Sequence, residues 1–152
     1  MNIKINNNMR EDFENWLFAM DDELDKFLTE LPTEVSKKLN YTPESLDILE
    51  EWMLKNFSDH KELLSKNNKK VQDNISRYIG ETFRKNLDSK WSIRFDDQKF
   101  AFFGLPILIE KENGNTIVCP HTLSTTTLAR REANFLSTIL FNNITRLGEK
   151  RT

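Results

Sequence analysis

The chain has 152 residues, of which 38% are hydrophobic and 30% are charged, and its formal net charge is −2. A chain of this length is the size of one domain and can bury a sizeable core. Its four glycines and four prolines are too few for a disordered or low-complexity scaffold. We therefore expect one domain over residues 1–152, with flexible tails at 1–8 and 148–152.

Several sequence features indicate a cytoplasmic protein. No run of about eighteen apolar residues is present, so we expect neither a membrane span nor a membrane partner. The first residues lack the apolar stretch of a signal peptide. Cys119 is the single cysteine, which excludes an internal disulfide bond. The heavy use of Asn, Lys and Ile is typical of an AT-rich, bacterial genome.

Three helices are predicted in the first half of the chain. Apolar residues recur every three or four positions from Met9 to Glu30, which predicts one continuous helix that Pro32 ends. Thr42 and Pro43 are start signals for a second helix that ends near Phe57. The third is expected over residues 58–86 as one long helix with an exposed middle turn.

Gly80 lies inside the third predicted helix, where glycine costs about 1 kcal/mol relative to alanine. We expect a strand or another helix to approach the backbone closely at this point. The residues that follow switch to alternation, with Trp91, Ile93 and Phe95 on one face of a predicted strand.

The predicted sheet continues through residues 99–109 and a hairpin with a turn at Asn113-Gly114. A long C-terminal helix is expected from Thr125 to Arg146. Helices and strands are thus segregated along the chain, which predicts an α+β fold: three N-terminal helices, a three- to four-stranded antiparallel meander and one long C-terminal helix. Residues 100–109 are apolar on both faces, which favours a homodimer through this segment.

Charge is unevenly distributed, since residues 1–50 carry twelve acidic and five basic side chains. The cluster Asp21, Asp22, Glu23 and Asp25 lies too far along the first helix to be explained by the helix dipole. Such a face can attract a basic protein partner. The alternative is an ordinary solvated helix face.

A second candidate site lies where the third helix meets the sheet. We expect it to consist of Tyr78, Glu81, Arg84, Trp91 and His121 and to bind a small molecule. The alternative is that Glu81 simply forms a short-range ion pair on a solvated helix face, which is worth a few tenths of a kcal/mol.

Other chemistries find little support. Cys119 and His121 lack an adjacent glycine-rich turn that could supply an oxyanion hole, so we expect no catalytic residue. Two distant histidines and one cysteine predict no metal site, and without a phosphate-binding loop we expect no cofactor. The basic residues between Lys61 and Arg77 have no interleaved aromatics, so we expect no nucleic-acid partner.

The segment Tyr78-Ile79-Gly80-Glu81, with Arg84, Leu87 and Trp91 and the later Val118-Cys119-Pro120, resembles uncharacterised small bacterial α+β proteins. Some proteins of this type resemble immunity proteins encoded beside secreted toxins. The resemblance implies a binding role. Together with the acidic face, it favours a non-enzymatic protein-interaction protein of the inhibitor or immunity type, with a small-molecule-binding protein or small enzyme as the alternative.

Overall fold

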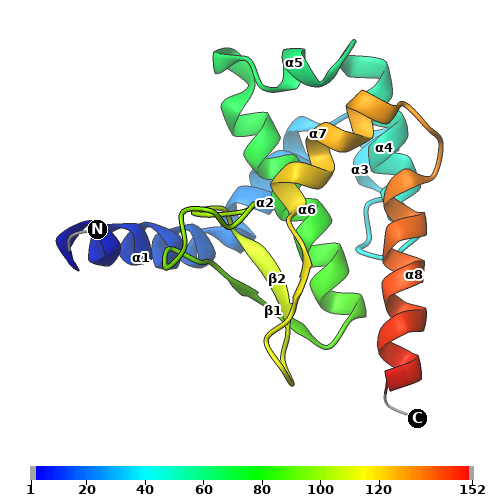
Figure 1. Ribbon diagram of the computed structural model, residues 1–152. Coiled ribbons are helices and arrows are strands. Elements are labelled where there is room, and N and C mark those ends of the chain that lie inside the picture. The colour runs from blue at the N-terminus through cyan, green and yellow to red at the C-terminus, as the bar shows by residue number, and fades with distance from the viewer. Residues whose placement is uncertain (1–2, 151–152) are drawn as a thin grey trace.

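The computed structural model describes residues 3–150 of the chain. Over these residues it contains eight α-helices, one 3-10 helix and a three-stranded antiparallel sheet (Figure 1). The predicted α+β class is confirmed. The helices are α1 (Ile3–Phe18), α2 (Met20–Glu30), α3 (Thr33–Ser36), α4 (Ser45–Asn56), α5 (His60–Leu63), η1 (Lys66–Asn68), α6 (Lys69–Asn86), α7 (Pro120–Arg130) and α8 (Phe135–Lys150). The strands are β1 (Ser89–Ser92), β2 (Ile107–Glu110) and β3 (Thr116–Val118).

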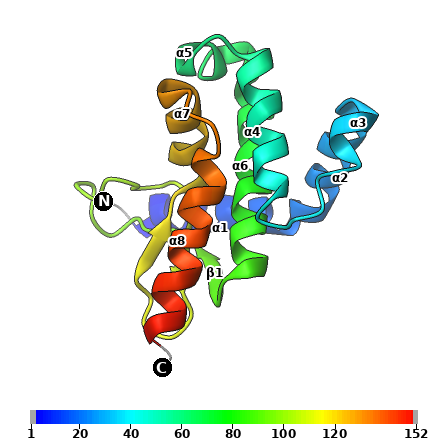
Figure 2. The same cartoon turned by 90° about the vertical axis from the view of Figure 1, so that its right-hand side faces the viewer.

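Helix α6 is the centre of the fold. Every residue from Asn74 to Phe83 is buried, so this helix is covered on all sides rather than along one stripe. It contacts α2, α7 and α8 and the first two strands. Figure 2 shows α4 and α8 running beside it, while α1 extends away from this bundle on the other side (Figure 1).

The sheet has the order β1-β2-β3, with β2 in the middle. Trp91 of β1 is opposite Leu108 of β2, and a long connection over residues 93–106 joins these two strands, whereas a short hairpin joins β2 to β3. The Trp91 ring lies against Gly80, and a Cβ added at Gly80 would overlap this ring and touch Pro120 of α7. The expected close approach at Gly80 is therefore confirmed.

The single helix predicted from Met9 to Glu30 is instead two helices that meet at Ala19. Trp16 of α1 packs against Trp91, whereas Leu24 and Phe27 of α2 belong to the core around α6. Trp16 also packs against the edge of this core, so both helices contribute to it from different sides of the break at Ala19.

The long helix predicted over residues 58–86 is also divided. Asp59 caps a single turn, α5, through the Glu62 backbone N–H, as its position three residues before Glu62 indicates. Ser65 then adopts an extended backbone, with ψ of 154°. The Asn68 side chain donates to the backbone carbonyl of Glu62. In a continuous helix this carbonyl would accept from a backbone N–H four residues on, so the side chain replaces that hydrogen bond at the end of α5.

The strand predicted over residues 99–103 is wrong, because these residues form successive turns. The Gly104 N–H donates to the carbonyl of Arg94, which closes the connection into a loop. Inside the loop, Phe100 packs on Phe102 and receives the Arg94 guanidinium over its ring. The apolar residues here are used by local packing instead of by a sheet. The hairpin at Asn113-Gly114 is confirmed, with a φ of +75° at Gly114.

The prediction of one continuous helix from Thr125 to Arg146 is also wrong, because α7 ends at Arg130 and α8 begins at Phe135. Arg131 adopts a left-handed conformation and donates to three carbonyls at the end of α4, those of Leu54, Phe57 and Ser58. These contacts are far apart in sequence, so periodicity could not reveal them.

The ends of the chain are more helical than expected. Helix α1 begins at Ile3 and α8 extends to Lys150, inside the predicted tails at 1–8 and 148–152. Residues 1, 2, 151 and 152 lie outside the described part. Between residues 3 and 150 no helix has the length and apolarity that crossing a bilayer requires.

Candidate functional site

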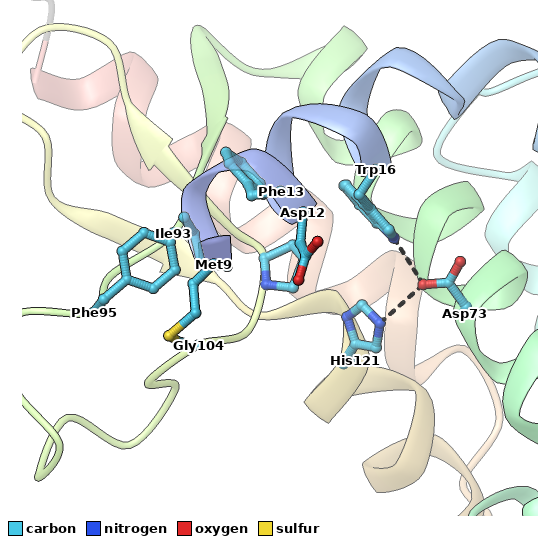
Figure 3. Close-up of a pocket in the computed structure, with 10 residues that line it drawn as sticks. Met9, Asp12, Phe13, Trp16, Asp73, Ile93, Phe95, Gly104 and His121 are labelled. Atoms are coloured by element: carbon cyan, nitrogen blue, oxygen red, sulfur yellow. Dashed lines mark hydrogen bonds and ion pairs between the residues drawn. The ribbon is translucent and has the colours of Figure 1, made fainter. Parts of the chain in front are cut away.

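Asp73, on the first half of α6, joins three elements through its carboxylate. Its Oδ1 accepts from Trp16 Nε1 of α1 at 2.8 Å and faces His121 Nε2 of α7 at 3.3 Å. Its Oδ2 accepts from Arg77 Nε, one turn along α6, at 2.9 Å. Figure 3 shows the Trp16 and His121 side chains converging on this one carboxylate.

The Asp73 carboxylate is held ionised. Partial burial by itself raises the pKa of Asp73, but the donors from His121, Trp16 and Arg77 outweigh it and lower the pKa from 3.8 to about 2. At neutral pH the site therefore contains a fixed negative charge with three side-chain donors around it.

Arg77 contacts both the backbone and the ring of Trp16. Its side chain is only 4% exposed, and its Nη1 donates to the Trp16 carbonyl at 2.7 Å. The guanidinium carbon lies 4.2 Å from the centroid of the Trp16 ring, a cation–π distance. Arg77, which the sequence placed at the end of a basic run, is thus an internal structural residue.

His121 has one occupied and one unoccupied ring nitrogen. It is the second residue of α7, after Pro120 at the first helical position. Nε2 faces the Asp73 carboxylate and so carries a proton, and whenever the ring is neutral Nδ1 is therefore an acceptor. Nδ1 is buried and has no hydrogen-bond partner within the described structure. Such an atom is uncommon in a folded protein.

His121 also lines a cavity of about 310 Å³. It lies between α1, α7 and the connection from β1 to β2, and Figure 3 shows Asp12, Phe13 and Trp16 of α1 among its lining residues. Its volume is at the lower end of the range of about 300–1,000 Å³ that is common for small-molecule sites. The apolar part of the lining consists of Met9, Phe13, Trp16, Ile93, Phe95, Gly104 and Pro106, and the polar part of Asp12, Asp73 and His121.

A second hollow, of about 340 Å³, lies between α3 and α4. Its lining includes Val35 and Trp52, but the charged side chains there, among them Lys38 and Lys55, are those of solvent-facing helix surfaces. No buried polar atom without a partner belongs to its lining. The cavity beside His121 is therefore the better candidate for a binding site.

The structure divides the ligand site predicted from the sequence into three parts. Glu81 is buried and accepts from both Trp91 Nε1, at 3.0 Å, and Arg84. The same two donors outweigh the effect of burial and lower the pKa of Glu81. His121 is separated from this group by Trp16, whose ring lies 4.9 Å from that of Trp91 and 6.3 Å from that of His121.

Tyr78 belongs to neither group. It is fully buried, and its hydroxyl lies 2.8 Å from Ser45 Oγ and accepts from the backbone N–H of Tyr41. Burial raises the pKa of the Tyr78 phenol. Tyr78 thus ties α6 to the start of α4 and does not line the cavity beside His121.

The acidic residues of α2 lie at the surface. Asp21, Asp22 and Asp25 are exposed, whereas Glu23 is half-buried and lies 3.8 Å from Lys26. Phe18, at the end of α1, is 91% exposed beside them. A hollow of about 230 Å³ next to this surface is lined by Leu17, Phe18, Met20, Asp21, Glu81, Arg84 and Trp91.

Cys119 is a buried residue at the start of α7, with its Sγ against the carbonyl of Pro106. It therefore packs against the β1–β2 connection rather than facing the cavity. Among the residues that the structure describes, no group of three His, Cys, Asp or Glu side chains is arranged to hold a metal ion.

Sequence reasoning missed Asp73, Trp16 and Asp12 as site residues. Trp16 falls within the apolar pattern from Met9 to Glu30, which predicts a residue of the core stripe, and Asp73 lies in a polar stretch of α6 without any motif. One signal was present: Asp73 and Arg77 are four apart on a helix, a spacing at which opposite charges pair. Nothing in the sequence indicated that Asp73 would face both α1 and α7.

Comparisons with known proteins found no match for this chain, neither to a protein-family model nor to a curated protein nor to a solved structure. The candidate site is therefore interpreted from its own geometry.

Proposed function

We propose that this protein binds a small, largely apolar molecule in the cavity beside His121. The observation that carries the proposal is His121, which lines a largely apolar cavity and whose buried Nδ1 has no partner among the described residues. Leaving such a group unsatisfied costs about 1–3 kcal/mol. A ligand with a suitably placed donor would remove this cost and bury the surrounding apolar surface.

The proposal is for binding rather than catalysis. The Asp73–His121 pair resembles the base and orienting acid of a hydrolase, but such a pair activates a nucleophile within hydrogen-bond reach. The described lining contains no hydroxyl, thiol or amine side chain that could serve in this role. We therefore assign the pair to ligand positioning.

A thermal-shift screen with a panel of apolar metabolites tests this function. A ligand at about 100 times its Kd should raise the Tm of the wild type by about 5 °C. In Ile93→Trp the larger side chain should fill the cavity and abolish the shift. In Val35→Trp, which blocks the second hollow, the shift should persist. A panel with no hit, or hits that Ile93→Trp leaves unchanged, would refute the proposal.

A second candidate function is binding of a basic protein partner, as an inhibitor or immunity-type protein in the cytoplasm. It is favoured by Phe18, because an aromatic side chain that is 91% exposed beside Asp21 and Asp22 is a suitable anchor for an interface. The exposed carboxylates would attract a positively charged surface and raise the association rate.

Affinity capture from native lysate at low and moderate salt tests the second function. A specific partner should be retained by the wild type and lost with Phe18→Ser, which should leave folding intact because Phe18 is already exposed. The neutralised variant Asp21→Asn/Asp22→Asn should weaken capture more at low salt than at moderate salt. A partner that these variants retain would bind elsewhere.

A homodimer through residues 100–109 is a further proposal. Ile107 and Leu108 are fully buried within the protomer, so the contact would have to use the partly exposed Phe100, Phe102 and Phe103. Sedimentation at tens of micromolar should then give twice the mass of the chain, and Phe102→Ser should restore the monomer mass.

A further inference from the structure

The polar side chains of the cavity beside His121 offer acceptors and no free donor. The two N–H groups in its lining, Trp16 Nε1 and His121 Nε2, are both directed at Asp73. The acceptors that remain are His121 Nδ1 and the carboxylate of Asp12. Asp12 is exposed at the mouth and has no hydrogen bond or ion pair within the described part of the chain. A ligand that makes polar contacts with these side chains must therefore supply the donors.

The charge of the lining favours a cation. Asp12 and Asp73 are both lining residues, and no lysine or arginine lines the cavity. Arg77 pairs with Asp73, whereas Asp12 forms no ion pair with another residue that the structure describes. A carboxylate or phosphate ligand would meet this charge without any side-chain donor to offset it, so anionic ligands are disfavoured.

The rings of the cavity favour the same kind of ligand. Phe13, Trp16 and Phe95 line it, and aromatic faces attract cations within about 6 Å of the ring centroid. The chain already uses this attraction nearby, since the Arg10 guanidinium lies 5.7 Å from the centroid of Phe95. Arg10 and Asp12 are both exposed, so solvent and salt screen both charges.

We propose that the cavity binds an organic ammonium ion, a protonated primary amine on a short arm of an apolar, ring-sized body. The ammonium group would donate to Asp12 and to His121 Nδ1, and the body would lie against Phe13 and Trp16. This inference rests on the proposed ligand-binding function and adds the chemical class of the ligand.

Three probes of nearly the same shape test the inference: phenethylamine, phenylethanol and phenylpropionate. Each is titrated into the full chain while the Trp16 indole N–H signal is followed by NMR, with isothermal titration calorimetry for affinity. The amine should shift the signal at the lowest concentration, the alcohol at a higher concentration and the carboxylate at the highest. An alcohol or carboxylate that binds more tightly than the amine would overturn the ammonium class and leave the ligand site itself standing.

Asp12→Asn isolates the charge. The substitution keeps the size of the side chain, and Asp12 is exposed and pairs with no described residue, so folding should be unchanged. The affinity for phenethylamine should fall about tenfold, the factor expected for loss of one charge-assisted contact. The affinity for phenylethanol should stay the same.

Glu14→Gln is the matched control, since Glu14 is an exposed acid on the same helix that does not line the cavity. It should leave both affinities unchanged. Equal amine affinities for the wild type and Asp12→Asn would overturn the ammonium assignment. If none of the three probes shifts the Trp16 signal, both the ammonium assignment and the proposed ligand-binding function are refuted.

Discussion

Two carboxylates on neighbouring helices, Glu50 and Asp73, show how differently this fold uses a negative charge that is removed from water. Glu50 of α4 is 2% exposed, and its oxygens accept the backbone N–H groups of Leu136, at 2.9 Å, and Phe135, at 3.2 Å. It thus caps the start of α8 from another helix. Asp73 accepts only from side chains, those of Trp16, Arg77 and His121.

The pKa values of the two carboxylates move in opposite directions. Burial raises the pKa of Glu50, although the N–H groups of Leu136 and Phe135 oppose the rise. Around Asp73 the donors outweigh burial and lower the pKa to about 2. Perturbed pKa values therefore do not by themselves distinguish a structural site from a functional one. What distinguishes Asp73 is that its partner His121 lines an open cavity and retains an unused nitrogen.

The largest effect is expected from Asp73→Asn, which leaves Arg77 buried without its carboxylate. Leaving the buried charge of Arg77 without its partner costs about 4 kcal/mol, and urea denaturation should show a loss of this order in the free energy of unfolding. Asp22→Asn, at an exposed position, should change it by less than about 0.5 kcal/mol. A loss below about 1 kcal/mol for Asp73→Asn would mean that the carboxylate does not organise the site.

Glu50→Ala should come next, with a loss of about 3 kcal/mol, because two backbone N–H groups at the start of α8 lose their acceptor. Ligand titrations that follow the Trp16 signal should be unaffected, in contrast to Asp73→Asn. The neighbouring Glu51→Ala removes only an exposed ion pair with Lys55 and should cost a few tenths of a kcal/mol. An effect of Glu50→Ala on ligand binding would contradict the proposal that Glu50 has a purely structural role while Asp73 belongs to the ligand site.

Gly80→Ala should destabilise the protein by about 2 kcal/mol, since the added methyl group would overlap the Trp91 ring and this cost exceeds the gain in helix propensity. The displaced Trp91 should also disturb Trp16, which packs on it edge-to-face. Gly148→Ala is the control, because a Cβ there meets nothing within 4 Å. It should stabilise α8 by up to about 1 kcal/mol, and equal effects at the two glycines would contradict the packing argument.

The smallest expected effect is the loss of stability that accompanies protonation of Asp73 at low pH. Asp73 has a lower pKa in the folded protein, about 2, than its usual value of 3.8, so its contribution is present above about pH 4 and is lost as the pH falls toward 2. With allowance for its partial exposure, the loss should be about 1.5 kcal/mol. Glu50 acts with the opposite sign, because its raised pKa makes the folded protein less stable as the pH rises through that pKa. Unfolding curves of wild type and Asp73→Asn between pH 2 and pH 6 should therefore converge toward the acid end.

Local chemistry was enough to predict several parts of the fold. The cap at Asp59, the turn at Asn113-Gly114 and the close approach at Gly80 all depend on residues within a few positions or on the properties of glycine itself. Periodicity also located the helical segments around α2, α4 and α6. It failed at their boundaries, because Ala19, Ser65 and Arg131 end or redirect helices in otherwise continuous apolar patterns.

The candidate site was predicted only in part. His121 was named, and Trp91 and Glu81 lie one ring away from it, but the site was centred on α6 and β1 rather than on α1. Asp73 and Trp16 are 57 positions apart, and Asp73 and His121 are 48 apart. No short-range pattern encodes such pairings, since they depend on how α1 and α7 are placed against α6.

The sequence by itself determined the α+β class, the segments that become helices and the hairpin, because these follow from apolar spacing, capping residues and turn chemistry along the chain. The tertiary structure alone decided where the helices break and which polar side chains meet. Glu50 and Arg131 place the start of α8 through contacts to distant backbone groups. Asp73 becomes the centre of a site only when α1 and α7 bring their donors to it, and burial then makes each unmatched polar atom costly enough to matter.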